Sequence, residues 1–209
     1  MQETARPALA LLTLSVFMIV GCSSSGDACE GTEQRICIVP FEDVSGDVVG
    51  KLVDHNKDEY GLHVKVLDKE SIPMEWVDAE RDQVGAVAPI EHMENLFPEA
   101  YADPDAILIG LTSVDMYTEA RDWRFAFWVS NIENNKSVVS SARMNPESFG
   151  LERDDDLLYS RARKVITRII GTLYFHLPES EDPRSVLYNN VLSLDDLDRM
   201  SEELPTGVR

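Results

Sequence analysis

Few residues of this chain combine the type and the spacing that metal or nucleophilic chemistry requires. The chain holds four histidines: His55, His63, His92 and His176. No two of them lie at i and i+4, the spacing that places two metal ligands on one helical face. His92 and Glu94 have the nearest metal-like spacing, which a single pair reaches by chance. We therefore expect no metal site built on the histidines, and we expect His176 to be a packed or surface-edge residue.

Nucleophilic and carboxylate chemistry are also poorly supported. The sequence has no G-x-S-x-G motif and no glycine-rich phosphate loop. Cys37 lies inside the apolar run Ile36–Phe41, which is typical of a buried strand and a poor setting for a reactive thiol. The acidic runs Asp154–Asp156 and Asp195–Asp196 stand where helices are expected to begin, and the helix dipole alone favours them there.

A basic face on the longest expected helix is the clearest cluster of charged side chains. The helix is predicted over Asp155–Leu177, with core spacing on its other faces. Its polar face carries Arg161, Lys164, Arg168 and Thr172. Two interpretations remain open. The face is either solvated, as on many surface helices, or Arg168 holds a carboxylate through its guanidinium group.

Strand-like and helix-like segments alternate along the chain, which predicts how these side chains are positioned. Strands are expected at Ile36–Phe41, Leu62–Leu67, Ala106–Leu111, Trp123–Val129 and Lys136–Ala142. Helices are expected at Asp47–Tyr60, at about Arg81–Phe97 with an interruption at Pro89, and from Ser193 to near Leu204. This order predicts an α/β layered domain with a mostly parallel twisted sheet and an antiparallel edge strand, packed against the long helix.

The amino terminus is typical of a bacterial lipoprotein signal. An uncharged stretch runs from Ala8 to Gly21, too short for a membrane span of roughly 20 residues but suited to a signal peptide. It ends at Gly21-Cys22, which resembles a lipobox, and a Ser/Gly tether follows. We expect a signal peptide at 1–21, a lipidated Cys22 opening a tether at 22–34, one domain at 35–204 and a tail at 205–209. The alternative is a buried amphipathic helix with a chance cysteine.

Composition narrows the choice of compartment and partner. A formal net charge of −19 repels nucleic-acid phosphates, so we expect no nucleic-acid partner. A lipid on Cys22 would anchor the chain to a membrane of the bacterial cell envelope, facing the periplasm or the surface, and Ser23 favours the outer membrane. In that oxidising setting Cys29 and Cys37 either form a disulfide or leave Cys37 as a buried free thiol.

Six sequence blocks in a fixed order carry a family resemblance. They are Ile38–Pro40, Ile107–Thr118, Phe125–Phe127, Val139–Met144, the helix from Arg163 and Asp195–Asp198. The most specific is TxxDxYT at Thr112–Thr118 followed by SxAR at Ser140–Arg143, since both their sequence and their spacing agree. Together the blocks resemble the archaemetzincins, metzincin-type zinc peptidases with a compact α/β fold. The resemblance covers about residues 35–204.

The resemblance implies a catalytic helix with the pattern H-E-x-G-H-x-x-G-x-x-H, whose histidines bind zinc and whose glutamate is the general base. When the helix is registered on Lys164 and Gly171, the pattern's key positions hold other residues. The first histidine falls at Arg168, the glutamate at Ile169, the second histidine at Thr172, the glycine at Phe175 and the third ligand at Pro178. Leu187 stands at the Met-turn methionine. We therefore expect no bound zinc and no catalytic residues.

Two classes of function follow from the resemblance. The first is an inactive pseudo-peptidase that acts as a binding or structural module. In metzincin-type folds an edge strand above the helix accepts extended peptide, and here Trp128, on the same strand face as Arg124, and Arg168 would contact it. The alternative is that Trp128 packs under a neighbouring helix, the edge is covered and Arg168 pairs with a carboxylate of this chain. Alternation along that strand would place Trp123, Phe125 and Phe127 on the core face. The second is a metallopeptidase or another hydrolase with an unrecognised site in the same cleft. The sequence leaves the partner and the oligomeric state open.

The lipid anchor gives a direct prediction. Metabolic labelling with a fatty acid should label the wild-type chain and fail to label Cys22→Ala, because the thiol of Cys22 is the expected attachment site. Mature protein should also lack residues 1–21. Equal labelling of both chains, or mature protein that still begins at Met1, would contradict the prediction.

Overall fold

The computed structural model of the chain describes residues 35–41, 44–118, 120–121 and 123–208. The expected signal peptide, Cys22, the tether and Cys29 lie outside these ranges and stay predictions. Within the ranges, no helix has the length and apolar character needed to cross a bilayer.

A five-stranded sheet forms the centre of the molecule. Its strands are β1 (Arg35–Phe41), β2 (Val64–Val66), β5 (Ala106–Thr112), β7 (Trp128–Asn131) and β8 (Lys136–Ser140), in the order β2-β1-β5-β8-β7. Every neighbouring pair is parallel except β8 and β7, which are antiparallel. The predicted α/β fold with a mostly parallel sheet and an antiparallel edge strand is therefore confirmed.

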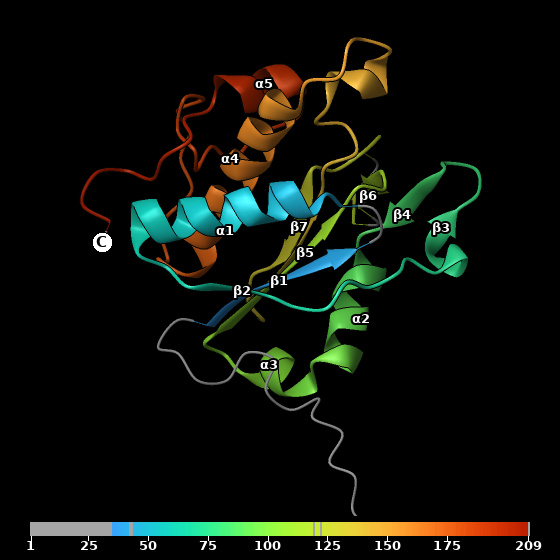
Figure 1. The fold of residues 1–209 in the computed structure, drawn as a ribbon, viewed down its shortest axis with the longest axis horizontal. Helices are drawn as coiled ribbons and strands as arrows, with labels where there is room; N and C mark the ends of the chain where they lie inside the picture. Colours follow the sequence, from blue (N-terminus) through green and yellow to red (C-terminus); the bar gives the residue numbers. More distant parts are fainter. Residues whose placement is uncertain (1–34, 42–43, 119, 122, 209) are drawn as a thin grey trace, which may run out of the picture.

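Helices cover both faces of this sheet (Figure 1). One face carries α1 (Gly46–Tyr60), α4 (Asp155–Leu173) and α5 (Leu194–Arg199), and the other carries α2 (Val87–Leu96) and α3 (Pro98–Ala102). Alternation along β1 divides the core in the same way. Ile36 and Ile38 pack with α1 and α4, whereas Val39 and Phe41 pack with α2 and α3. The sheet is buried on both faces, which explains its continuous apolar strands.

Smaller elements surround this core. A three-stranded sheet has the order β3-β4-β6, with β3 at Val77–Asp78, β4 at Gln83–Gly85 and β6 at Met116–Tyr117. Two short 3₁₀ helices lie at Met74–Trp76 and Pro146–Phe149. The small sheet extends from the side of the molecule next to α2 (Figure 1).

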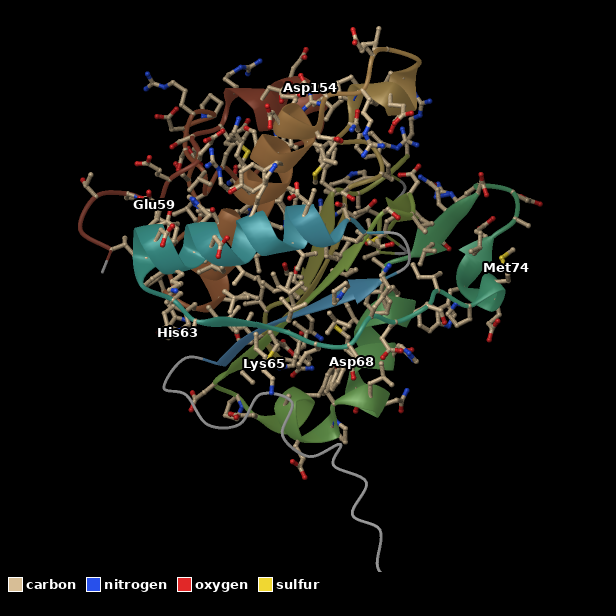
Figure 2. All side chains as sticks on the ribbon, in the orientation of Figure 1. Glu59, His63, Lys65, Asp68, Met74 and Asp154 are labelled. Carbon is tan, nitrogen blue, oxygen red and sulfur yellow. The ribbon has the colours of Figure 1, made fainter. Side chains whose placement is uncertain are left out.

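The expected start of the last two helices is confirmed in atomic detail. Asp154, labelled at the start of α4 in Figure 2, accepts a hydrogen bond from the Leu157 N–H. Ser193 accepts one from the Asp196 N–H at the start of α5. Both are N-cap contacts that satisfy a backbone donor with no partner inside its helix. The helices end earlier than predicted, at Leu173 and Arg199.

The expected helix over Arg81–Phe97 is wrong in its first half. Gln83–Gly85 is the buried strand β4, and the helix begins only at Val87. Pro89 does not interrupt α2, because it lies in the first turn, where the missing N–H would have no helical partner.

The expected strand over Trp123–Val129 is also wrong in its first half. Regular pairing with β8 begins at Trp128, and residues 123–127 form an irregular segment. Trp123 is 39% exposed, so it does not join Phe127 in the core as the alternation predicted. These residues are held by tertiary contacts in place of a strand ladder, and they form a wall of the cleft described below.

Cys37 is buried in β1 and is disulfide-bonded. A free thiol at this position, one of the two alternatives, is therefore wrong. The sequence holds two other cysteines, Cys22 and Cys29, and both lie outside the described residues. Pairing with Cys29 stays a prediction, and it is the pairing that leaves Cys22 available for a lipid.

Lys136 in β8 is a buried ammonium group without a carboxylate partner among the described residues. Its side chain is fully buried, and Nζ donates to the carbonyl oxygens of Ala106, at 2.8 Å, and Ala100, at 3.2 Å. The ammonium also lies 5.5 Å from the centre of the Tyr101 ring. Burial lowers the pKa of Lys136 from 10.5 to about 8.

This pKa predicts a stability that rises with pH. Above about pH 8 the folded chain releases the Lys136 proton, whereas the unfolded chain keeps it until about pH 10.5. The unfolded state then binds more protons, so the free energy of unfolding increases through this window, by on the order of 2 kcal/mol. Urea denaturation from pH 7 to 10 should show this gain relative to Lys136→Met. Parallel pH profiles of the two chains would contradict it.

Candidate functional site

A cleft of about 510 Å³ lies where α4 meets the edge of the central sheet. Its lining comes from three parts of the chain: the segment before and at the start of β7, the region of α4 and the residues just after it, and the loop before α5. The lining residues are Arg121, Trp123–Trp128, Arg168, Glu179 and Asn189–Leu192. The cleft thus combines aromatic side chains with three arginines and two asparagines.

The aromatic wall is fixed from behind by backbone hydrogen bonds. The Ala126 N–H donates to the Met116 carbonyl at 2.7 Å, and the Phe127 carbonyl accepts from the Ser140 N–H at 2.9 Å. The Phe125 and Phe127 rings meet edge to face, with centres 5.0 Å apart. These contacts hold the irregular segment in one conformation without a regular strand pairing.

The two sequence blocks TxxDxYT and SxAR meet directly behind this wall. The Arg143 guanidinium donates two hydrogen bonds to the Asp115 carboxylate, from Nε to Oδ1 at 2.9 Å and from Nη2 to Oδ2 at 2.6 Å, so the pair is bidentate. The carboxamide of Gln83 donates to Asp115 and to the Arg124 carbonyl, both at 2.9 Å. The guanidinium carbon of Arg143 lies 4.5 Å from the centre of the Phe125 ring. The Asp115–Arg143 pair therefore positions the cleft wall.

Arg168 lies at the base of the cleft and is only 4% exposed. Its Nη2 donates to the Glu179 carboxylate at 2.5 Å, and its Nη1 donates to the Leu187 carbonyl at 3.3 Å. The indole ring of Trp128 stacks over the guanidinium group at 5.0 Å. Burial lowers the pKa of Arg168, and the bond to Glu179 opposes that shift. Guanidinium remains protonated in proteins, so Arg168 is a fixed cation.

The other residues at the positions that the resemblance assigns to the zinc site make structural contacts or are exposed. Ile169 is 1% exposed and belongs to the core. The Thr172 hydroxyl donates back along its own helix, with the Arg168 and Ile169 carbonyls both at 3.1 Å. Pro178 is exposed and has no side-chain donor atom. Gly171 is kept, and it allows close packing: an added Cβ would lie 2.8 Å from Leu187 and 2.6 Å from Leu204.

These positions do not fit a zinc ion. A tetrahedral catalytic site needs about three protein ligands with free lone pairs. Arg168 offers only donors and carries the same sign of charge as the metal, and Thr172 and Pro178 offer no nitrogen or sulfur ligand. Within the described ranges, no group of three or more His, Cys, Asp or Glu side chains is arranged to hold a metal ion.

The four histidines are dispersed over the molecule. His55 is on α1, His92 is on α2 and the exposed His176 follows α4 with a φ of +51°. His63 precedes β2 and lies at the surface (Figure 2). His92 faces Trp76 edge to face at 4.9 Å. None of the four is among the described residues that line the cleft.

The polar face of α4 is buried, so the expectation of a solvated face is wrong. Arg161 donates two hydrogen bonds to the Asp198 carboxylate, at 2.7 and 2.6 Å, and a third to the Met144 carbonyl oxygen at 2.6 Å. Lys164 donates to the carbonyls of Leu197 and Asp198 near the end of α5, at 3.2 and 2.9 Å. These contacts fasten α5 to α4. A cation at a helix C-terminus also complements the helix dipole.

The sequence located part of the cleft and missed the rest. Arg168 and Trp128 do lie together in it, as expected. Glu179, Arg121 and the loop Asn189–Leu192 were not expected there. One sequence feature could have indicated that Glu179 lines the cleft. Glu179 directly follows Pro178, which the resemblance places at the third ligand position.

Sequence comparison relates the chain to archaemetzincins. The archaemetzincin of Methanocaldococcus jannaschii is 26% identical over 163 residues, which cover 77% of this chain and 84% of that protein. The archaemetzincin of Thermococcus kodakarensis is 32% identical over 90 residues, covering 43% of this chain and 46% of that protein. No protein-family model matches the chain.

Solved structures give the same relationship for the fold. The crystal structure of archaemetzincin from Methanopyrus kandleri has a TM-score of 0.64 and 24% identity, covering 88% of this chain and 92% of that one. Archaemetzincin from Archaeoglobus fulgidus, complexed with malonate, has a TM-score of 0.65 and 19% identity over 84% and 98% of the two chains. A zinc-dependent peptidase from Methanocorpusculum labreanum has a TM-score of 0.66 and 22% identity over 82% and 97%. The chain has the fold of these proteins.

The buried polar face of α4 predicts a strong stability effect. Arg161→Gln should lower the free energy of unfolding by about 2 kcal/mol, because the change breaks an ion pair whose arginine side chain is 7% exposed and whose Asp198 side chain is 39% exposed, and it leaves the buried Met144 carbonyl without its donor. Arg184→Gln is the matched control, since Arg184 is 80% exposed and pairs with neighbouring Asp182. Urea denaturation should shift the midpoint for Arg161→Gln and leave that of Arg184→Gln unchanged. Equal midpoints for all three chains would contradict the structural role.

Proposed function

We propose that this chain is a catalytically inactive member of the archaemetzincin family, anchored in the bacterial cell envelope by a lipid on Cys22. Its cleft binds extended peptide and does not hydrolyse it. Support for the family comes from the sequence similarity over most of the chain and from the shared fold. Support for the anchor comes from the amino-terminal sequence alone.

The observation that carries the loss of activity is the buried guanidinium of Arg168 at the first ligand position. Zinc at that place would meet a cation fixed by Glu179, Leu187 and Trp128. Metal-assisted peptide hydrolysis depends on a zinc-bound water and a general base. Here the base position holds Ile169, a core residue that cannot accept a proton.

The cleft supports the binding half of the proposal. Its wall runs into β7, which is the last strand of the five-stranded sheet in the described part of the chain. An extended peptide can add to such an edge through its backbone, while side-chain pockets provide selectivity. Trp123 and Leu192 line the cleft and are 39% and 53% exposed, so both offer apolar contact surface.

The proposal predicts binding without hydrolysis. The full chain, purified in nonionic detergent and dialysed, should retain substoichiometric zinc by elemental analysis. A labelled unstructured peptide should gain fluorescence anisotropy on addition of the chain and should be recovered intact. The zinc-dependent peptidase of Methanocorpusculum labreanum, treated in the same way, is the positive control for both assays.

The competing function is a hydrolase that uses the same cleft with a different set of residues. One zinc per chain together with hydrolysis that a chelator abolishes would falsify the inactive assignment. Hydrolysis that resists the chelator would point to a metal-independent hydrolase. If the peptide is recovered intact and its anisotropy does not rise, the proposed peptide binding is contradicted.

A further inference from the structure

In the described part of its lining, the cleft carries more positive than negative charge, although the chain as a whole is strongly acidic. The chain has a formal net charge of −19, yet three arginines line the cleft, at 121, 124 and 168. Among the described lining residues, Glu179 supplies the only carboxylate. Charges of one sign gathered in a cleft attract ligands of the opposite sign more strongly than the same charges spread over a surface. The cleft is therefore suited to an anionic ligand.

The three arginines present their charge in different ways. Arg168 is buried and held from three sides, so it is already oriented for a carboxylate. Arg121 and Arg124 are exposed, and Arg121 stacks on the Trp123 ring at 4.8 Å. One oriented guanidinium at the base and two exposed ones nearer the solvent make an arrangement that can take more than one carboxylate of an extended chain.

The carboxylate now bonded to Arg168 belongs to a residue that is half in solvent. The Glu179 side chain is 53% exposed, whereas the Arg168 side chain is 5% exposed. Glu179 lies in the segment after α4, and no second hydrogen bond of its carboxylate is found in the described part of the chain. Glu179 can thus leave without disturbing the core, while Arg168 stays fixed and needs another anion.

We propose that the cleft is a receptor for acidic peptides and that Glu179 is its built-in competitor. A glutamate or aspartate side chain of the ligand displaces the Glu179 carboxylate from Arg168. Arg121 and Arg124 hold further carboxylates, and the aromatic wall contacts the apolar parts of the peptide. This inference rests on the proposed peptide-binding function and adds the chemistry of the ligand to it.

If Glu179 competes with the ligand, replacing it should tighten binding of an acidic peptide. If Glu179 were only a structural contact, replacing it should not tighten binding. Glu179→Gln removes the competing charge but keeps an amide oxygen that can accept from Arg168. The full chain in nonionic detergent is titrated into a labelled, end-blocked peptide that contains glutamates and apolar residues. The same peptide with glutamine in place of glutamate is the neutral probe.

Wild-type chain should bind the glutamate peptide more tightly than the glutamine peptide, and added salt should reduce the difference. Glu179→Gln should tighten binding of the glutamate peptide by at least about fivefold and leave the glutamine peptide unchanged. Arg168→Gln should abolish the preference. Arg184→Gln changes a residue that is 80% exposed and does not line the cleft, so it should behave as wild type.

Two exposed variants keep the test decisive if Arg168→Gln fails to fold. Arg121→Gln and Arg124→Gln change solvent-exposed residues and should each reduce the preference for the glutamate peptide. Equal binding of the two peptides by wild type and by Glu179→Gln would overturn the acidic-ligand inference and leave peptide binding intact. Weaker binding of the glutamate peptide by Glu179→Gln would overturn the competitor role. Failure of both peptides to bind any variant would remove the proposed function itself.

Discussion

A buried guanidinium group needs anions and carbonyl oxygens around it, and Arg168 imposes this requirement on the whole cleft. Taking the ion out of water costs several kcal/mol unless hydrogen bonds and charges compensate. Glu179, the Leu187 carbonyl and the face of Trp128 supply that compensation from three separate parts of the chain. The loop that contains Leu187, the segment after α4 and the edge strand β7 are therefore coupled through one side chain.

The surrounding frame depends on similar contacts between distant segments. Strands β5 and β8 are parallel, so their carboxyl ends lie side by side at the same end of the sheet. The segments that follow these strands therefore bring Asp115 and Arg143 together. That pair supports the aromatic wall. On α4, Arg161 and Lys164 hold α5 in place. The fold is that of the archaemetzincin structures, and three positions that the sequence resemblance assigns to the zinc site and its general base carry a cation, a back-bonded hydroxyl and a core aliphatic side chain.

The sequence predicted the elements whose burial pattern is strong and local. β1, α1, β5 and the start of α4 follow from apolar runs, helical spacing and a capping residue. β4 was missed because three residues are too few to show a period, and Pro89 was misjudged because its effect depends on where the helix begins. Residues 123–127 alternate like a strand, yet tertiary contacts decide their conformation.

The site was harder to predict for a physical reason. A basic helical face has the same sequence pattern whether it faces water or distant carboxylates. Only the fold places Asp198 beside Arg161, 37 residues away, and Glu179 beside Arg168, 11 residues away. The resemblance pointed to Arg168, but its burial and its partner required the structure.

The most direct test of the central claim is an NMR spectrum of the arginine side chains in the full chain. If Arg168 is a fixed cation in place of a metal ligand, its Nη protons should give separate, slowly exchanging signals, assigned by their loss in Arg168→Lys. Addition of equimolar zinc should leave these signals unchanged. A single averaged signal from a freely rotating guanidinium, or a shift of the Arg168 signals on addition of zinc, would contradict the account.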